Sequence, residues 1–82
     1  MSDAQALDHF RQATFASPGD SLARYHYAHL LYQNGSAKRA LVQLNILMAE
    51  LSSLQAELFL SDGETRVAEL LRAVRQFREL LL

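Results

Sequence analysis

Residues 20–51 read DSLARYHYAHLLYQNGSAKRALVQLNILMAEL, and this stretch predicts two amphipathic helices joined by a tight turn. Apolar residues recur every three to four positions in both halves, which is the spacing of one helical face. They are Leu22, Tyr25, Ala28, Leu31 and Tyr32 in the first half, and Ala40, Leu41, Leu44, Leu47, Met48 and Leu51 in the second. Between the halves, Gly35 suits the left-handed backbone that ends a helix, and Asp20 and Ser36 are expected to cap the two helix starts.

The composition favours a single all-α domain over residues 1–82. Half of the residues are hydrophobic, with three glycines and one proline, a balance typical of a helical globular protein. A formal net charge of −1 provides no field that would attract nucleic acid. The chain lacks cysteine, a leader-like start and any apolar run of membrane-spanning length. We therefore expect a cytoplasmic protein with no cofactor, no nucleic-acid partner and no membrane partner.

Helices are also expected on both sides of the central pair. Ser2 and Gln5 have capping-box spacing and predict a helix to about Ala16, which Ser17-Pro18-Gly19 would end. Residues 54–60, LQAELFL, are predicted to form a separate short helix, with an extension of the preceding helix as the alternative. Residues 61–64, SDGE, repeat the capping-box spacing and are expected to start the last helix. The total is four to five helices.

The last helix carries the clearest amphipathic pattern beyond the central pair. Its apolar stripe consists of Val67, Leu70, Leu71, Val74, Phe77 and Leu81. A helix that hides one face must dock on the central pair or on another chain. Leucines at positions 80, 81 and 82 cannot all lie on one side of a helix, so at least one is expected to project outward.

The chain repeats weakly with a period of 34 residues, which places Ala6 on Ala40, Phe10 on Leu44 and Ala13 on Leu47. This period and the small residues at positions 28 and 40 resemble the tetratricopeptide repeat (TPR) family. The resemblance implies a half repeat over residues 4–16, up to Pro18, and a full repeat over residues 20–53. The period fails after Ser53, so residues 54–82 are expected to be divergent capping helices. The implied fold is a TPR-like antiparallel helix array with a long C-terminal capping or docking helix.

The same resemblance implies a concave binding groove along the first helix of the full repeat. The side chains implied to face it are Leu22, Tyr25, His29, Tyr32 and Gln33, and the apolar anchors proposed on the last helix are Leu70, Val74 and Phe77. Helical spacing independently places Tyr25, His29 and Tyr32 on one face. The alternative is that the two tyrosines only pack against neighbouring helices.

Other candidate chemistry is weaker. His26 and His29 are three residues apart, but no further ligands follow at a recognisable spacing, so no metal site is predicted. Arginines at 72, 75 and 78 allow a phosphate-binding or acidic-partner patch, although a solvated face is favoured. No catalytic motif is present, so we do not expect an enzyme.

Two functions remain as expectations. The first is a small TPR-like adaptor or chaperone that binds a helical or extended segment of a partner protein. The second is a self-association module that forms a homo-oligomer through the last helix. A regulatory fragment with a separate catalytic partner is a minor third alternative.

Overall fold

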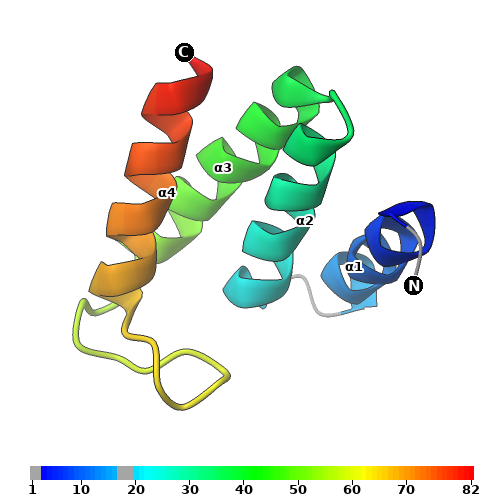
Figure 1. The fold of residues 1–82 in the computed structure, drawn as a ribbon. Helices are drawn as coiled ribbons and strands as arrows, with labels where there is room; N and C mark the ends of the chain where they lie inside the picture. The colour runs from blue at the N-terminus through cyan, green and yellow to red at the C-terminus, as the bar shows by residue number, and fades with distance from the viewer. Residues whose placement is uncertain (1–2, 17–19) are drawn as a thin grey trace.

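The computed structural model describes residues 3–16 and 20–82, and this part of the chain forms four helices (Figure 1). They are α1 (Asp3–Ala16), α2 (Ser21–Gln33), α3 (Ala37–Ser52) and α4 (Val67–Leu81). The all-α prediction is confirmed, and the bounds of the first three helices agree with the sequence pattern. The predicted cap at Ser2 and the predicted break at 17–19 lie outside the described residues.

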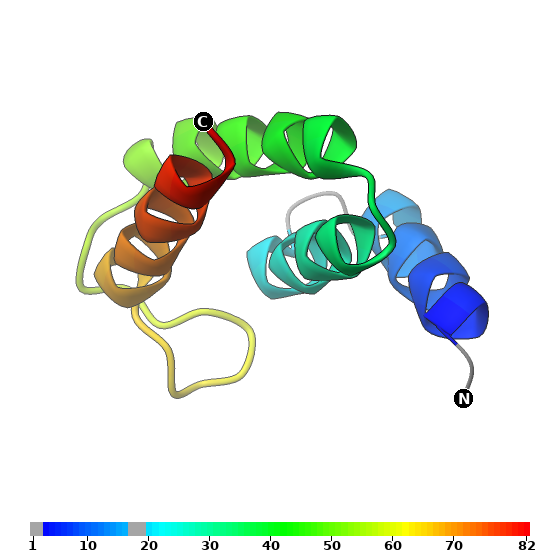
Figure 2. The same cartoon turned by 45° about the horizontal axis from the view of Figure 1, so that its top comes forward.

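The helices form an array in which each packs chiefly on its neighbour along the chain. The main contacts join α1 with α2, α2 with α3, and α3 with α4. In Figure 1, α2 and α4 run in the same direction and α3 runs against them. Figure 2 shows α3 along one side, with α2 and α4 beside it and α1 beyond α2. The array therefore brings α2 and α4 close together although they are far apart in the sequence.

Two groups of buried side chains hold the array together. The larger lies between α2, α3 and α4, and consists of Ala28, Leu44, Leu47, Leu51, Val67, Leu70, Val74 and Phe77. The smaller consists of Tyr27, Leu31 and Ala40, and Leu7 of α1 packs against it. Both alanines expected to permit close helix packing, Ala28 and Ala40, are fully buried. The 34-residue period also pairs Phe10 and Ala13 of α1 with residues of α3, but the side chains of Phe10 and Ala13 lie outside the described part of the structure.

Tyr27 of α2 packs in the core although it lies outside the apolar stripe predicted for this helix. Its ring is buried, and its hydroxyl accepts a hydrogen bond from Arg39 Nη2 at 3.2 Å. A second polar contact joins the same two helices, because Arg24 Nη1 donates to Gln43 Oε1 at 2.7 Å. Since α2 has neighbours on two sides, its buried face is wider than the stripe of a helix that covers one neighbour.

The turn between α2 and α3 forms as predicted, but one of the two caps does not. Gly35 has a φ of 82°, which is the left-handed conformation that glycine adopts at little cost. Asp20 Oδ1 accepts a hydrogen bond from the Ala23 amide at 3.2 Å and caps α2. Ser36 precedes α3, yet its side chain makes no capping bond, so its predicted capping role is wrong.

Asp20→Ala is expected to lower the free energy of unfolding by about 1 kcal/mol, because the substitution leaves an amide of the first turn of α2 without its acceptor. Thermal unfolding followed by circular dichroism measures the change. Ser36→Ala is the matched control at the next helix start, and it should change stability by less than about 0.5 kcal/mol. Equal losses in the two variants would contradict the assignment of the caps.

Residues 54–60 do not form the predicted short helix. The connection from 53 to 66 instead folds back on itself, as the yellow segment of Figure 1 shows. The amide of Leu60 donates to the Thr65 carbonyl at 2.7 Å, and the amide of Val67 donates to the Leu58 carbonyl at 2.9 Å. An isolated antiparallel bridge pairs Phe59 with Arg66. An apolar run this short gains little from helix formation, because nucleation is unfavourable.

The start of α4 is also later than predicted, because SDGE forms a turn rather than a capping box. Asp62 Oδ1 accepts hydrogen bonds from the amides of Glu64 at 3.0 Å and Thr65 at 2.9 Å. Gly63 follows with a φ of 71°, a conformation that favours glycine. The helix begins at Val67 after Arg66, whose side chain makes no capping bond. Aspartate followed by glycine is a strong hairpin signal, and it overrides the Ser-to-Glu spacing.

Candidate functional site

The candidate site is a groove between α2 and α4, called the α2/α4 groove. Its hollow has a volume of about 360 Å³. It is lined by Tyr25, His29, Tyr32 and Gln33 of α2 and by Ala73, Gln76, Phe77 and Leu80 of α4. The α2 side chains lie one turn apart along one face, and the array positions that face toward α4. The groove is therefore formed by side chains of two helices that lie far apart in the sequence.

Phe77 is the centre of an aromatic cluster in this groove. The centroid of its ring lies 4.4 Å from that of His29, 5.5 Å from that of Tyr32 and 6.3 Å from that of Tyr25. The two tyrosines meet Phe77 edge-on, at interplanar angles of 86° and 83°. Edge-to-face pairs of this kind are favourable because the positive ring edge meets the negative ring face. The cluster therefore joins α4 to α2 and forms the aromatic floor of the groove.

The groove carries little charge at neutral pH. Burial lowers the pKa of the His29 imidazole below its usual value, and the nearby His26 lowers it further. Burial raises the pKa of the Tyr25 hydroxyl. His29 is thus mainly neutral at pH 7, and Tyr25 keeps its proton. The remaining polar groups of the lining are the Tyr32 hydroxyl and the amides of Gln33 and Gln76. This chemistry suits apolar side chains accompanied by uncharged hydrogen-bonding groups.

The structure brings together most of the side chains that the sequence analysis placed in a groove. Tyr25 is half-buried against the larger core group, whereas Tyr32 has 50% of its surface exposed. Each tyrosine ring packs against Phe77 and also lines the hollow, so the tyrosines do more than pack against a neighbouring helix. Leu22 lies further along α2, where it packs against the core and lines a neighbouring hollow.

Two of the predicted anchors on α4 are misplaced. Leu70 and Val74 are buried in the larger core group, so their side chains are not available to a partner. Phe77 is 7% exposed and reaches the groove with one part of its ring. The physical reason is that α4 docks its stripe on α2 and α3 of the same chain, which leaves the flank of the stripe at the surface.

Three lining residues of α4 were missed by the sequence analysis. Ala73, Gln76 and Leu80 follow one another at intervals of three and four residues, beside the buried stripe. Leu80 is 82% exposed and is the large apolar side chain at the end of the groove. One small, one polar and one apolar residue beside an apolar stripe form no distinctive sequence pattern, so only the docking of α4 identifies them.

The described residues contain no group of three or more histidine, aspartate or glutamate side chains that could hold a metal ion. His26 is exposed, and its ring centroid lies 6.3 Å from that of Tyr25. None of the helices in residues 3–16 and 20–82 combines the length and the apolar character that crossing a membrane requires.

The fold places this chain in the class of all-α helix arrays. Comparisons of the chain with protein-family models, with curated proteins and with solved structures found no match.

Proposed function

We propose that this protein is a small TPR-like interaction module that binds a segment of a partner protein in the α2/α4 groove. The observation that carries the proposal is the convergence of Tyr25, His29 and Tyr32 with Phe77 around an open hollow. Aromatic side chains with a polar tip dominate the energetics of many interfaces, because they offer a large apolar area and a hydrogen bond together.

The TPR-like character rests on three further features. The array alternates in direction from α2 to α4, its helices pack on their chain neighbours, and Ala28 and Ala40 are fully buried. Small buried residues let helix axes approach closely, with larger side chains in the grooves on either side. In such an array the partner segment would lie along α2 and α4. This arrangement supports the proposed adaptor or chaperone role.

The proposal is tested with peptides selected from a displayed random library against the wild-type chain. A selected peptide is synthesised, and its dissociation constant is measured by titration calorimetry. Replacing Tyr25 and Tyr32 by alanine should weaken binding about 30-fold or more, as expected when interface hot spots are truncated. Circular dichroism should show unchanged helicity at the temperature of the titration.

The matched control replaces Val42 and Ile46 by alanine, because both are exposed apolar residues of α3 that do not line the groove. These changes should leave the dissociation constant within about twofold of the wild type. A peptide that loses affinity to the control variant, but not to the tyrosine variant, would place the binding site elsewhere and contradict the groove.

A second candidate function is self-association through α4. The exposed Leu80 favours it, since a large apolar side chain at the mouth of a hollow suits an interface. In a twofold dimer, the same surface of each copy would meet its counterpart. Sedimentation equilibrium separates the two functions, because a monomer at all concentrations contradicts self-association. If the wild-type chain is a dimer and the Leu80→Ser variant is a monomer, self-association rather than the adaptor function is supported.

A further inference from the structure

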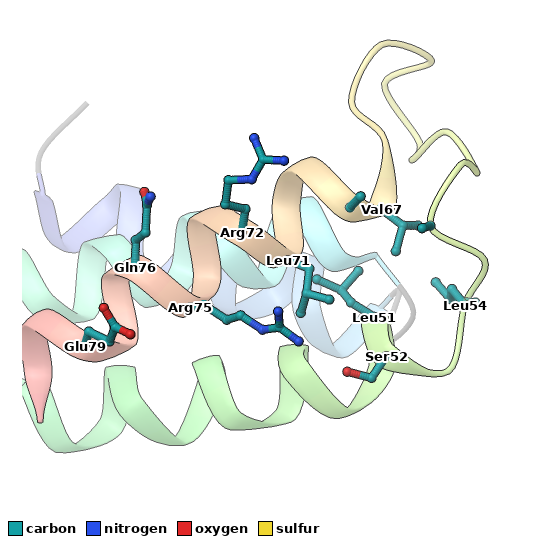
Figure 3. Close-up of a pocket in the computed structure, with 11 residues that line it drawn as sticks. Leu51, Ser52, Leu54, Val67, Leu71, Arg72, Arg75, Gln76 and Glu79 are labelled. Carbon is teal, nitrogen blue, oxygen red and sulfur yellow. The ribbon is translucent and has the colours of Figure 1, made fainter.

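A second hollow lies on the other side of α4, between α4, the end of α3 and the connection that follows it. We call it the α3/α4 hollow, and Figure 3 shows it in close-up. Its volume is about 570 Å³. The residues that matter here are Leu51, Leu54, Leu71, Arg72, Arg75 and Glu79. None of these six residues lines the α2/α4 groove, and Gln76 of α4 is the residue that the two linings share.

The floor of the α3/α4 hollow is apolar at one end. Leu51 is buried and Leu71 is half-buried, whereas Leu54 stands in the connection with 45% of its surface exposed. In Figure 3 these leucines cluster beside the start of α4, where α3 ends. Ala56 and Ala68 also line this end, and their small side chains leave room for another molecule to approach. The floor can therefore receive apolar side chains.

Two arginines border the floor without a partner. Arg72 and Arg75 are both exposed, and neither makes a hydrogen bond or ion pair with the described residues. In Figure 3 the Arg75 side chain extends across the gap toward Ser52 of α3, whereas Arg72 extends on the side of α4 away from α3. Glu79 lines the same hollow but forms no ion pair with either arginine. The guanidinium groups are thus available to external carboxylates.

We propose that the α3/α4 hollow docks an acidic amphipathic helix of a partner protein. Arginine binds carboxylates in paired hydrogen bonds, so its planar group favours an acidic occupant. Arg72 and Arg75 both line the hollow but extend in different directions, so a docked helix would meet them with acidic residues at two separate positions. Apolar residues on the adjoining face of that helix would cover Leu54 and Leu71.

The length of the site agrees with a helix of a few turns. The lining runs along α4 from Val67 to Glu79, and this span corresponds to about 18 Å at the rise of an α-helix. The competing explanation is that the arginine stems cover Leu71 and that nothing else binds. The other alternative is that a second copy of this chain occupies the hollow. The experiments below distinguish the proposal from both alternatives.

The test uses two fluorescein-labelled peptides of about four helical turns with the same leucine stripe. One carries glutamate at the positions beside the stripe, and the other carries lysine there. Fluorescence anisotropy with the full chain at low ionic strength should give binding of the acidic peptide at least about tenfold tighter than of the basic one. Added salt should weaken the binding of the acidic peptide.

Charge variants make the test specific. Replacing Arg72 and Arg75 by glutamine should weaken binding of the acidic peptide about tenfold. Arg72→Gln and Arg75→Gln are also measured singly, and each is compared with Lys38→Gln. This control removes one exposed positive charge from α3 outside the hollow and should have almost no effect on binding. Replacing both arginines by glutamate should reverse the preference, so that the basic peptide binds more tightly than the acidic one.

Three results would overturn the proposal. The first is equal binding of the acidic and basic peptides by the wild-type chain. The second is a loss of acidic-peptide binding in Lys38→Gln as large as in the single arginine variants. The third is a preference for the acidic peptide that persists in the double glutamate variant. If sedimentation shows a dimer for the wild-type chain and a monomer for the double glutamate variant, the occupant of the hollow is a second copy of the chain rather than a partner helix. Tyr32→Ala changes only the α2/α4 groove and should leave binding of the acidic peptide unchanged. A failure of the proposed groove function would therefore be distinguishable from a failure of this proposal. Circular dichroism verifies that every variant is folded.

Discussion

Phe77→Ala is expected to lower the free energy of unfolding by about 3–5 kcal/mol, the range for truncating a buried phenylalanine. Phe77 is 7% exposed, belongs to the larger core group and meets the rings of Tyr25, His29 and Tyr32. Its loss leaves a cavity where α4 meets α2. Since domains of this size are stable by about 5–10 kcal/mol, the variant should be close to unfolding at 25 °C.

Urea denaturation monitored by circular dichroism measures this effect, and the midpoint should fall strongly. Phe59→Ala is the matched control, because Phe59 is 55% exposed in the connection before α4. Its ring contacts the Arg66 guanidinium, whose carbon lies 4.7 Å from the ring centroid. That exposed contact is worth about 1 kcal/mol at most. Similar midpoints for the two variants would show that Phe77 does not join the helices as described.

Leu44→Ala is expected to lower the free energy of unfolding by about 2–5 kcal/mol, through lost burial and the cavity that remains. Leu44 is fully buried in the middle of α3, within the core group shared by α2, α3 and α4. A cavity there weakens the packing of both neighbours of α3. The loss should therefore lower the unfolding midpoint of the whole array in one cooperative step.

Leu58→Ala removes the same atoms from an exposed side chain of the connection, so it controls for the chemistry of the substitution. It should cost less than about 1 kcal/mol, because little burial is lost. Guanidinium denaturation of both variants gives the comparison. A cost for Leu58→Ala equal to that for Leu44→Ala would mean that the connection, rather than α3, supports the array.

The periodicity of residues 20–51 was sufficient to predict α2, α3 and the turn between them. Apolar spacing, Asp20 before α2 and Gly35 after it all favour the same local structure, so the prediction did not depend on tertiary contacts. The stripe on α4 was equally clear, and its members are buried or half-buried. These elements are strong because local and long-range preferences coincide.

The connection from 53 to 66 was the main error in the predicted fold. Its leucines and Phe59 resemble the stripe of a short helix, yet Leu54, Leu58 and Phe59 each have about half of their surface exposed. The backbone follows the turn at Asp62-Gly63, where a carboxylate accepts amide hydrogen bonds. Hydrophobicity alone could not decide between the two structures, because a short apolar run is compatible with either.

The candidate site was predictable on α2 but not on α4. Tyr25, His29 and Tyr32 share a helical face whatever that face contacts, so their grouping followed from spacing alone. Which part of α4 lies opposite depends on how α4 docks. A stripe such as Leu70, Val74 and Phe77 fits the chain's own core and a partner equally well in sequence terms. Only the three-dimensional arrangement shows that the first two are buried and that Leu80 is exposed.

The neighbour-to-neighbour packing of the helices also bears on how the chain reaches its native state. Most stabilising contacts join segments that adjoin in the sequence, as α1 with α2, α2 with α3, and α3 with α4 do. Such a topology has a low contact order, and helical proteins of this kind fold within microseconds to milliseconds. The meeting of Phe77 with Tyr25 closes the longest loop of the aromatic cluster. That closure is the entropically most demanding step, so α4 is the element whose docking completes folding.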